Sequence, residues 1–70
     1  MKYQVKHSID GRIRFQLGKQ SLTSSEEDIL EQYLLAKEGV ERVKVYRRTA
    51  SVAIWYSNAK SEILAYMKEY

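Results

Sequence analysis

The chain has no cysteine, one histidine and no hydrophobic run long enough to cross a bilayer. Without cysteine, neither a disulfide framework nor a thiolate metal site can stabilise its small core. The longest apolar run, residues 52–56, is far shorter than the ~20 residues of a membrane-spanning helix. The N-terminus also lacks the apolar run of a signal peptide. We therefore expect one domain over residues 1–70, cytoplasmic or tethered at the cytosolic side of a membrane, with no direct membrane insertion.

The net charge of +3 is distributed unevenly along the 70 residues. Residues 1–19 carry a net charge of +4 and residues 40–57 carry +3, whereas residues 20–39 carry −4. The basic segments coincide with predicted strands and the acidic segment with a predicted helix. This separation of charge is one clue to an interaction surface.

The turn Asp10-Gly11 is a strong hairpin signal, with alternating apolar residues in 3–9 before it and 13–17 after it. A two-residue loop would place the two apolar sets on opposite faces of the sheet. We therefore predict a three-residue loop, in which Gly11 takes the left-handed position of a bulged turn. In this arrangement His7 faces the core.

A first helix is predicted after three candidate N-caps, Thr23, Ser24 and Ser25, with Ser24 and Glu27 forming a capping box. Gly39 is placed for a left-handed C-cap. The residues at helical spacing that should face the core are Ile29, Leu30, Tyr33 and Leu34.

A second hairpin is predicted from residues 40–48 and 52–56, with its turn at residues 48–50. A second helix, capped by Ser57 or Asn58, follows it. The inward residues of this half are Val43, Val45, Val52, Ile54, Tyr56, Ile63, Leu64, Met67 and Tyr70.

The element order is strand, strand, helix, strand, strand, helix. It predicts an α+β two-layer sandwich, ββαββα, with a four-stranded antiparallel sheet and two helices on one face. From residue 13 onward the order is that of a ferredoxin-like fold lacking its last strand. We expect residues 3–9 to occupy the position of that strand. In the rival arrangement, residues 3–17 form one long bent strand in a three-stranded sheet.

The valine pattern Gly39-Val40-x-x-Val43-x-Val45, with Thr49 and Val52-x-Ile54-x-Tyr56, resembles the second half of heavy-metal-associated domains. The opening His7-Ser8-Ile9-Asp10-Gly11-Arg12-Ile13-Arg14 is similar to a divergent branch of that family, which usually has proline at the position of Asp10. This branch is found at the cytosolic N-termini of metal-transporting P-type ATPases. The resemblance implies a metal-transport context, with the ATPase transport core as partner, within the chain or in trans.

The sequence departs from that family in the loop where ordinary members bind copper(I), zinc or cadmium through Cys-x-x-Cys. Here residues 18–25 contain no Cys, His or Met, so the soft ligands that these ions prefer are missing. His7 is the one imidazole available, and a single imidazole gives at most a weakly bound transition-metal cation. Met1 and Met67 are the possible soft partners, and a site shared by two chains stays open, as does a homodimer.

A second candidate site is the outward sheet face. Because successive strand residues point to opposite faces, the side chains expected on this face are Lys6, Arg12, Arg14, Arg42, Lys44, Tyr46 and Trp55. Basic groups beside exposed aromatics are typical of surfaces that bind single-stranded nucleic acid. We favour docking of an acidic protein surface over nucleic acid for this face. The remaining alternative is an ordinary solvated sheet face, on which the cationic stems cover Trp55. The chain has no nucleophile beside a base and no phosphate-binding glycine loop, so we expect no enzyme.

Two functional hypotheses follow. The first is a noncatalytic regulatory or docking module of a metal cation-transporting P-type ATPase system, which uses the His7–Arg14 stretch and the basic face. The second is a small single-stranded nucleic-acid-binding domain that uses Trp55, Tyr46, Arg12 and Arg14.

Overall fold

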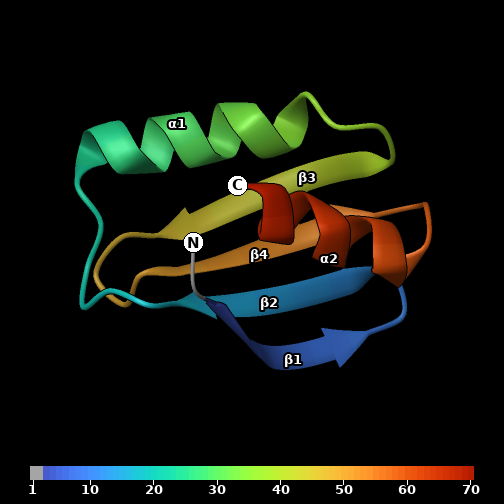
Figure 1. Ribbon diagram of the computed structural model, residues 1–70, viewed down its shortest axis with the longest axis horizontal. Coiled ribbons are helices and arrows are strands. Elements are labelled where there is room, and N and C mark those ends of the chain that lie inside the picture. Colours follow the sequence, from blue (N-terminus) through green and yellow to red (C-terminus); the bar gives the residue numbers. More distant parts are fainter. Residues whose placement is uncertain (1–2) are drawn as a thin grey trace.

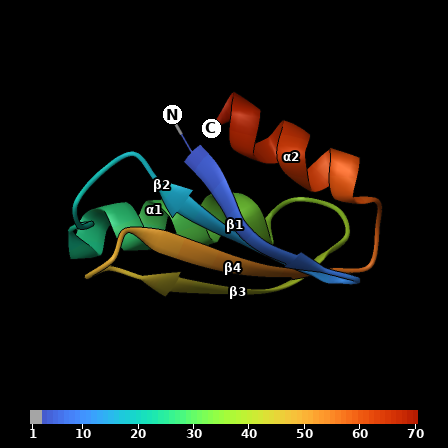
Figure 2. The same ribbon diagram turned by 90° about the horizontal axis from the view of Figure 1, so that it is seen from below.

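The computed structural model describes residues 3–70 and contains the predicted elements in the predicted order (Figure 1). These are β1 (Tyr3–Ile9), β2 (Arg12–Leu17), α1 (Ser24–Leu35), β3 (Val40–Tyr46), β4 (Ser51–Tyr56) and α2 (Lys60–Glu69). The strands form one antiparallel sheet, and both helices lie on the same side of it (Figure 2). The predicted α+β sandwich is confirmed. Within residues 3–70, no helix has the length and apolar character needed to cross a membrane.

The strand order is β1-β2-β4-β3. The edge strand β1 lies antiparallel beside β2, which is the position of the last strand in a ferredoxin-like sheet. The N-terminal strand therefore replaces the missing C-terminal one, as predicted, and the single bent strand is wrong.

The loop between β1 and β2 has two residues, Asp10 and Gly11, so the predicted three-residue loop is wrong. Ile9 pairs directly with Arg12, and Gly11 has the predicted positive φ, at 79°. Because opposite residues share a face, this register turns Ile9 and His7 away from the core. His7 pairs with Arg14 on the outer side of the sheet, so its predicted place on the core face is also wrong.

A bulge at Lys6 restores the core register in the first half of β1. The pairing shifts by one residue between Val5 and His7, so that Val5 lies opposite Phe15. Tyr3 returns to the core side as well, with its ring edge-on to Phe15 at 5.3 Å between centroids. The extra residue that we expected in the turn is thus accommodated inside the strand.

The N-cap of helix α1 lies one residue earlier than predicted. Thr23 is the N-cap: its Oγ1 accepts from the Glu26 N–H at 3.1 Å, and the Glu26 carboxylate accepts from the Thr23 N–H at 2.9 Å. Lys19 donates a hydrogen bond to the same carboxylate, and this bond, together with the Thr23 amide, lowers the pKa of Glu26. The capping box is therefore formed by Thr23 and Glu26, and the predicted Ser24–Glu27 capping box is wrong.

The connection from α1 to β3 and the first turn of α2 meet at Asn58. Helix α2 has Ala59 as its N-cap with no side-chain cap, so the predicted cap by Ser57 or Asn58 is wrong. Asn58 instead donates from Nδ2 to the Glu38 carbonyl at 3.0 Å and to the Glu62 carboxylate. Helix α1 ends at Leu35, and Gly39, at φ 86°, turns the chain into β3.

The core lies between the sheet and the two helices. Its fully buried side chains include Ile13, Phe15, Leu34, Val52, Ile54, Ile63 and Met67. Tyrosines join the helices: the Tyr33 hydroxyl donates to the Tyr66 carbonyl at 2.7 Å, and the Tyr33 and Tyr70 rings lie 4.9 Å apart. Ile29 was predicted to face the core but is 60% exposed, because the buried stripe of α1 centres on Leu30 and Leu34.

Gly39→Ala should destabilise the fold by about 1–3 kcal/mol, because an added Cβ requires a strained positive φ. That Cβ would also lie 2.2 Å from Cγ of Asn58. The measurement is the free energy of unfolding from urea denaturation. Gly18→Ala, in the exposed loop after β2, is the control and should change stability by less than about 0.5 kcal/mol. Equal effects of the two substitutions would contradict this account of the α1–β3 junction.

Candidate functional site: the outer sheet face

The strand register brings the predicted interaction residues together on the side of the sheet away from the helices. Trp55 of β4 pairs with Arg12 of β2 on one side and with Arg42 of β3 on the other. Two residues along, Ala53 pairs with Arg14 and Lys44. We call this surface the outer sheet face, and its defining residues are Arg12, Arg14, Arg42, Lys44, Tyr46 and Trp55.

Trp55 lies between two guanidinium groups. The Cζ of Arg12 is 5.1 Å from the ring centroid and the Cζ of Arg42 is 4.8 Å from it. Both distances are within the range of cation–π attraction. Because the two arginines come from the strands on either side of β4, the indole is flanked from both directions.

Tyr46 lies between the other two cations. The Cζ of Arg14 is 5.7 Å from its ring centroid and the Nζ of Lys44 is 5.4 Å from it. Arg14 belongs to β2 and Tyr46 to β3, with β4 between them. To approach Arg14, the Tyr46 ring must therefore reach across β4.

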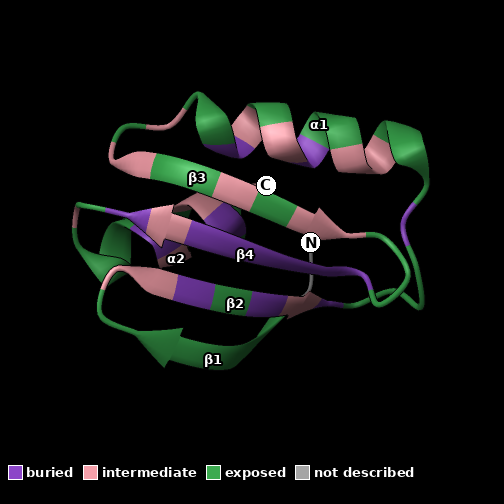
Figure 3. Cartoon of the chain, turned by 180° about the vertical axis from the view of Figure 1, so that it is seen from behind, coloured by how far each residue is buried: buried purple, intermediate pink, exposed green. Residues whose placement is uncertain are grey.

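This arrangement explains why β4 is buried on a face that no helix covers (Figure 3). Ser51 and Ala53 point to the outer side of the sheet, yet both are 0% exposed. Small side chains on the central strand leave room for Tyr46 and the cationic stems to cover them. The outer sheet face is thus closed by its own side chains.

The four cations of the outer sheet face have no carboxylate partner in the described part of the chain. The paired positions of this face contain no acidic residue; they are Gln4, His7, Ile9, Arg12, Arg14, Gln16, Arg42, Lys44, Tyr46, Ser51, Ala53 and Trp55. Glu41 is the unpaired residue at the bulge of β3, next to Arg42, and it forms no ion pair with the described cations. The two ion pairs within residues 3–70, Lys19–Glu26 and Arg47–Glu27, lie elsewhere. A guanidinium that stacks by its face keeps its edge N–H groups free to donate to an external carboxylate.

The donors around His7 do not fit a metal site. His7 is exposed beside Arg14, whose positive charge opposes a bound cation. Met67 is fully buried in the core on the other side of the sheet, and Met1 lies outside the described residues. Within residues 3–70, no three His, Cys, Asp or Glu side chains gather as metal ligands.

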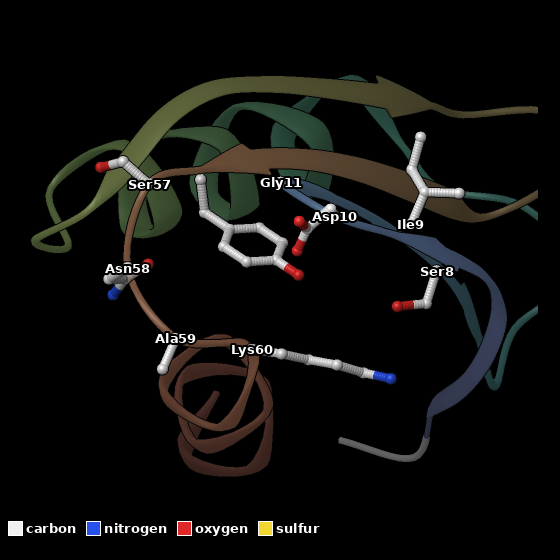
Figure 4. A pocket seen from close by; sticks show the side chains of 9 residues that line it. Ser8, Ile9, Asp10, Gly11, Ser57, Asn58, Ala59 and Lys60 are labelled. Carbon is white, nitrogen blue, oxygen red and sulfur yellow. The ribbon is translucent and has the colours of Figure 1, made fainter.

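The turn residues Asp10 and Gly11 line a shallow hollow of about 690 Å³ at one end of the sheet (Figure 4). Its opposite wall is the connection from β4 to α2, including Tyr56 and Lys60. The Gly11 carbonyl accepts from the Tyr56 N–H at 3.0 Å, which anchors the turn to β4. Asp10 and Lys60 are both exposed, so their charges stay in solvent. Asn58 also lines the hollow, and its Oδ1 is buried without a hydrogen-bond partner, while its Nδ2 is bound to the Glu38 carbonyl and the Glu62 carboxylate.

Comparisons with known proteins add no identification. No family model, curated protein or solved structure matches this chain.

The outer sheet face should concentrate anions around Trp55, the single tryptophan of the chain. We expect the iodide quenching constant of its fluorescence to fall by roughly half in Arg12→Gln/Arg42→Gln and with added salt. Quenching by neutral acrylamide should not fall in parallel. Lys60→Gln/Lys68→Gln, which removes two exposed cations from α2, is the control. If the control lowers iodide quenching as much as the arginine pair does, the local field is not the cause.

Proposed function

We propose that this chain is a noncatalytic docking module whose outer sheet face binds an acidic surface of a partner protein. The observation that carries the proposal is a set of four cations around two aromatic rings, on a sheet face that no helix covers. Within residues 3–70 none of these cations forms an ion pair with a carboxylate. Because the cationic side chains are held against the aromatic rings, they lose little conformational freedom when a carboxylate binds.

The proposed context is a metal cation-transporting P-type ATPase system, with the transport core as the partner. The support is the likeness of the His7–Arg14 stretch and of the valine pattern to heavy-metal-associated domains. The module then regulates or docks rather than carries the ion, because residues 18–25 contain no cysteine. In addition, no group of three ligand-type side chains that includes His7 forms within residues 3–70. Metal binding is at most weak.

The chemistry of the face sets the expected binding behaviour. Charge-assisted hydrogen bonds from arginine to carboxylate are stronger than neutral ones. Exposed charges contribute more to the rate of encounter and to specificity than to affinity. Binding should therefore be fast, of moderate affinity and sensitive to ionic strength.

Single-stranded nucleic acid is the second candidate, because cations stand beside two aromatic rings on an open sheet. The geometry favours it less. A base stacks on the flat face of a ring, and here Trp55 has a guanidinium near it from each neighbouring strand. A carboxylate needs only the free N–H edges of those arginines and displaces nothing.

The test is a titration with an acidic peptide, followed by amide chemical shifts and Trp55 fluorescence. We expect saturable amide shifts on β2, β3 and β4. The affinity for the peptide should decrease with added salt, and it should fall at least about tenfold in Arg14→Gln/Lys44→Gln. Lys60→Gln/Lys68→Gln should bind like the wild type.

A titration with oligothymidylate runs in parallel. Absence of saturable binding to the acidic peptide would overturn the docking proposal. Tighter binding to the oligonucleotide, abolished by Trp55→Ala, would establish the nucleic-acid function in its place.

A further inference from the structure

The cations of the outer sheet face form two parallel lines. Arg12 and Arg14 lie along β2, and Arg42 and Lys44 lie along β3. Strand β4 runs between them. With neighbouring strands about 4.8 Å apart, the two lines are separated by about 10 Å.

The strip between the two lines is aromatic. Trp55 rises from β4 itself, and the Tyr46 ring reaches over β4 toward Arg14. Both residues remain partly exposed. The face therefore presents a central ridge of aromatic surface along β4, bordered on each side by a line of positive charge.

An α-helix matches this pattern in width. With its side chains a helix is about 10–12 Å across, close to the distance between the two basic lines. Laid along β4, it would place an apolar stripe on the aromatic ridge and the residues flanking that stripe above β2 and β3. On the inner side of the same sheet, helix α2 already contributes Ile63 and Met67 to the core.

We infer that the partner segment bound by this face is an amphipathic helix, with an apolar stripe flanked on both sides by Asp or Glu. The inference rests on the proposed docking function and specifies its ligand. Along each line the two cations are two strand residues apart, about 7 Å. Carboxylates three or four residues apart on a helix, about 6 Å between their Cβ atoms, can meet both cations of one line.

An extended acidic segment fits the face less well. Successive side chains of a strand point to opposite sides, so its carboxylates toward the sheet form a single line. Such a segment can pair with the cations of β2 or with those of β3, but not with both at once. Docking through both lines therefore distinguishes a helix from an extended chain.

The experiment uses two helical peptides of about 18 residues with the same composition. In the first, glutamates flank a leucine stripe on both sides; in the second, they occupy the helix surface opposite that stripe. Trp55 fluorescence and amide shifts give the affinities, and circular dichroism verifies that both peptides are helical. We expect the first peptide to bind at least about tenfold more tightly.

Two matched variants test the contribution of each basic line to binding. Arg12→Gln/Arg14→Gln neutralises the line on β2, and Arg42→Gln/Lys44→Gln neutralises the line on β3. Each should weaken binding of the first peptide by a similar factor, since its carboxylates engage both lines. Unchanged amide spectra outside the substituted sites will show that the variants remain folded.

The outcomes separate this inference from the docking function itself. Equal affinity for the two helices, or loss of binding in one line variant alone, would overturn the two-sided helix while leaving acidic docking intact. Tighter binding of an unstructured polyglutamate peptide than of the first helix would also overturn it. If none of these acidic peptides binds, the docking function fails together with the inference.

Discussion

The central strand β4 must be shielded on both sides, although the two helices of this fold cover only one side of the sheet. On the inner side Val52 and Ile54 pack into the core. On the outer side the chain places small residues on β4 itself, Ser51 and Ala53, and covers them from the neighbouring strands. Ser51 is paired with Gln16 and Tyr46 and hydrogen-bonded to Thr49, and Ala53 is paired with Arg14 and Lys44. The long side chains that flank β4 therefore shield it and also form the basic aromatic surface. The outer sheet face owes its composition to this constraint.

Most of the fold follows from the sequence because apolar periodicity is a local property that survives in the structure. The six elements, their order and the edge position of β1 were all predictable in this way. The register of the first hairpin was not. The turn at Asp10-Gly11 has two residues, whereas core packing places Val5 opposite Phe15. These two registers differ by one residue, and the bulge at Lys6 takes up the difference. Nothing at Lys6 itself marks it as a bulge. The N-cap of α1 was equally ambiguous, because Thr23–Glu26 and Ser24–Glu27 fit the same pattern and the contact from Lys19 separates them.

The candidate site, like the fold, could be predicted from the sequence only in part. Alternation along β2, β3 and β4 is sufficient to place Arg12, Arg42 and Trp55 on one face. It cannot show that Tyr46 crosses β4 to meet Arg14, because this depends on the small size of residues on another strand. It also misplaces His7, since a single bulge reverses the face of every residue that follows it. With its true position beside Arg14, His7 belongs to the edge of the basic surface rather than to a buried metal site.

The most direct test of this account is whether the four cations serve binding rather than folding. A variant with Arg12, Arg14, Arg42 and Lys44 all replaced by Gln keeps much of the stem length that covers β4 but removes every positive charge. Its free energy of unfolding, measured by urea denaturation at low salt, should lie within about 1–2 kcal/mol of the wild type. Lost cation–π attraction is then offset by relief of repulsion among unpaired like charges. A loss of several kcal/mol would contradict the account, because the charges would then be part of what holds the sheet together.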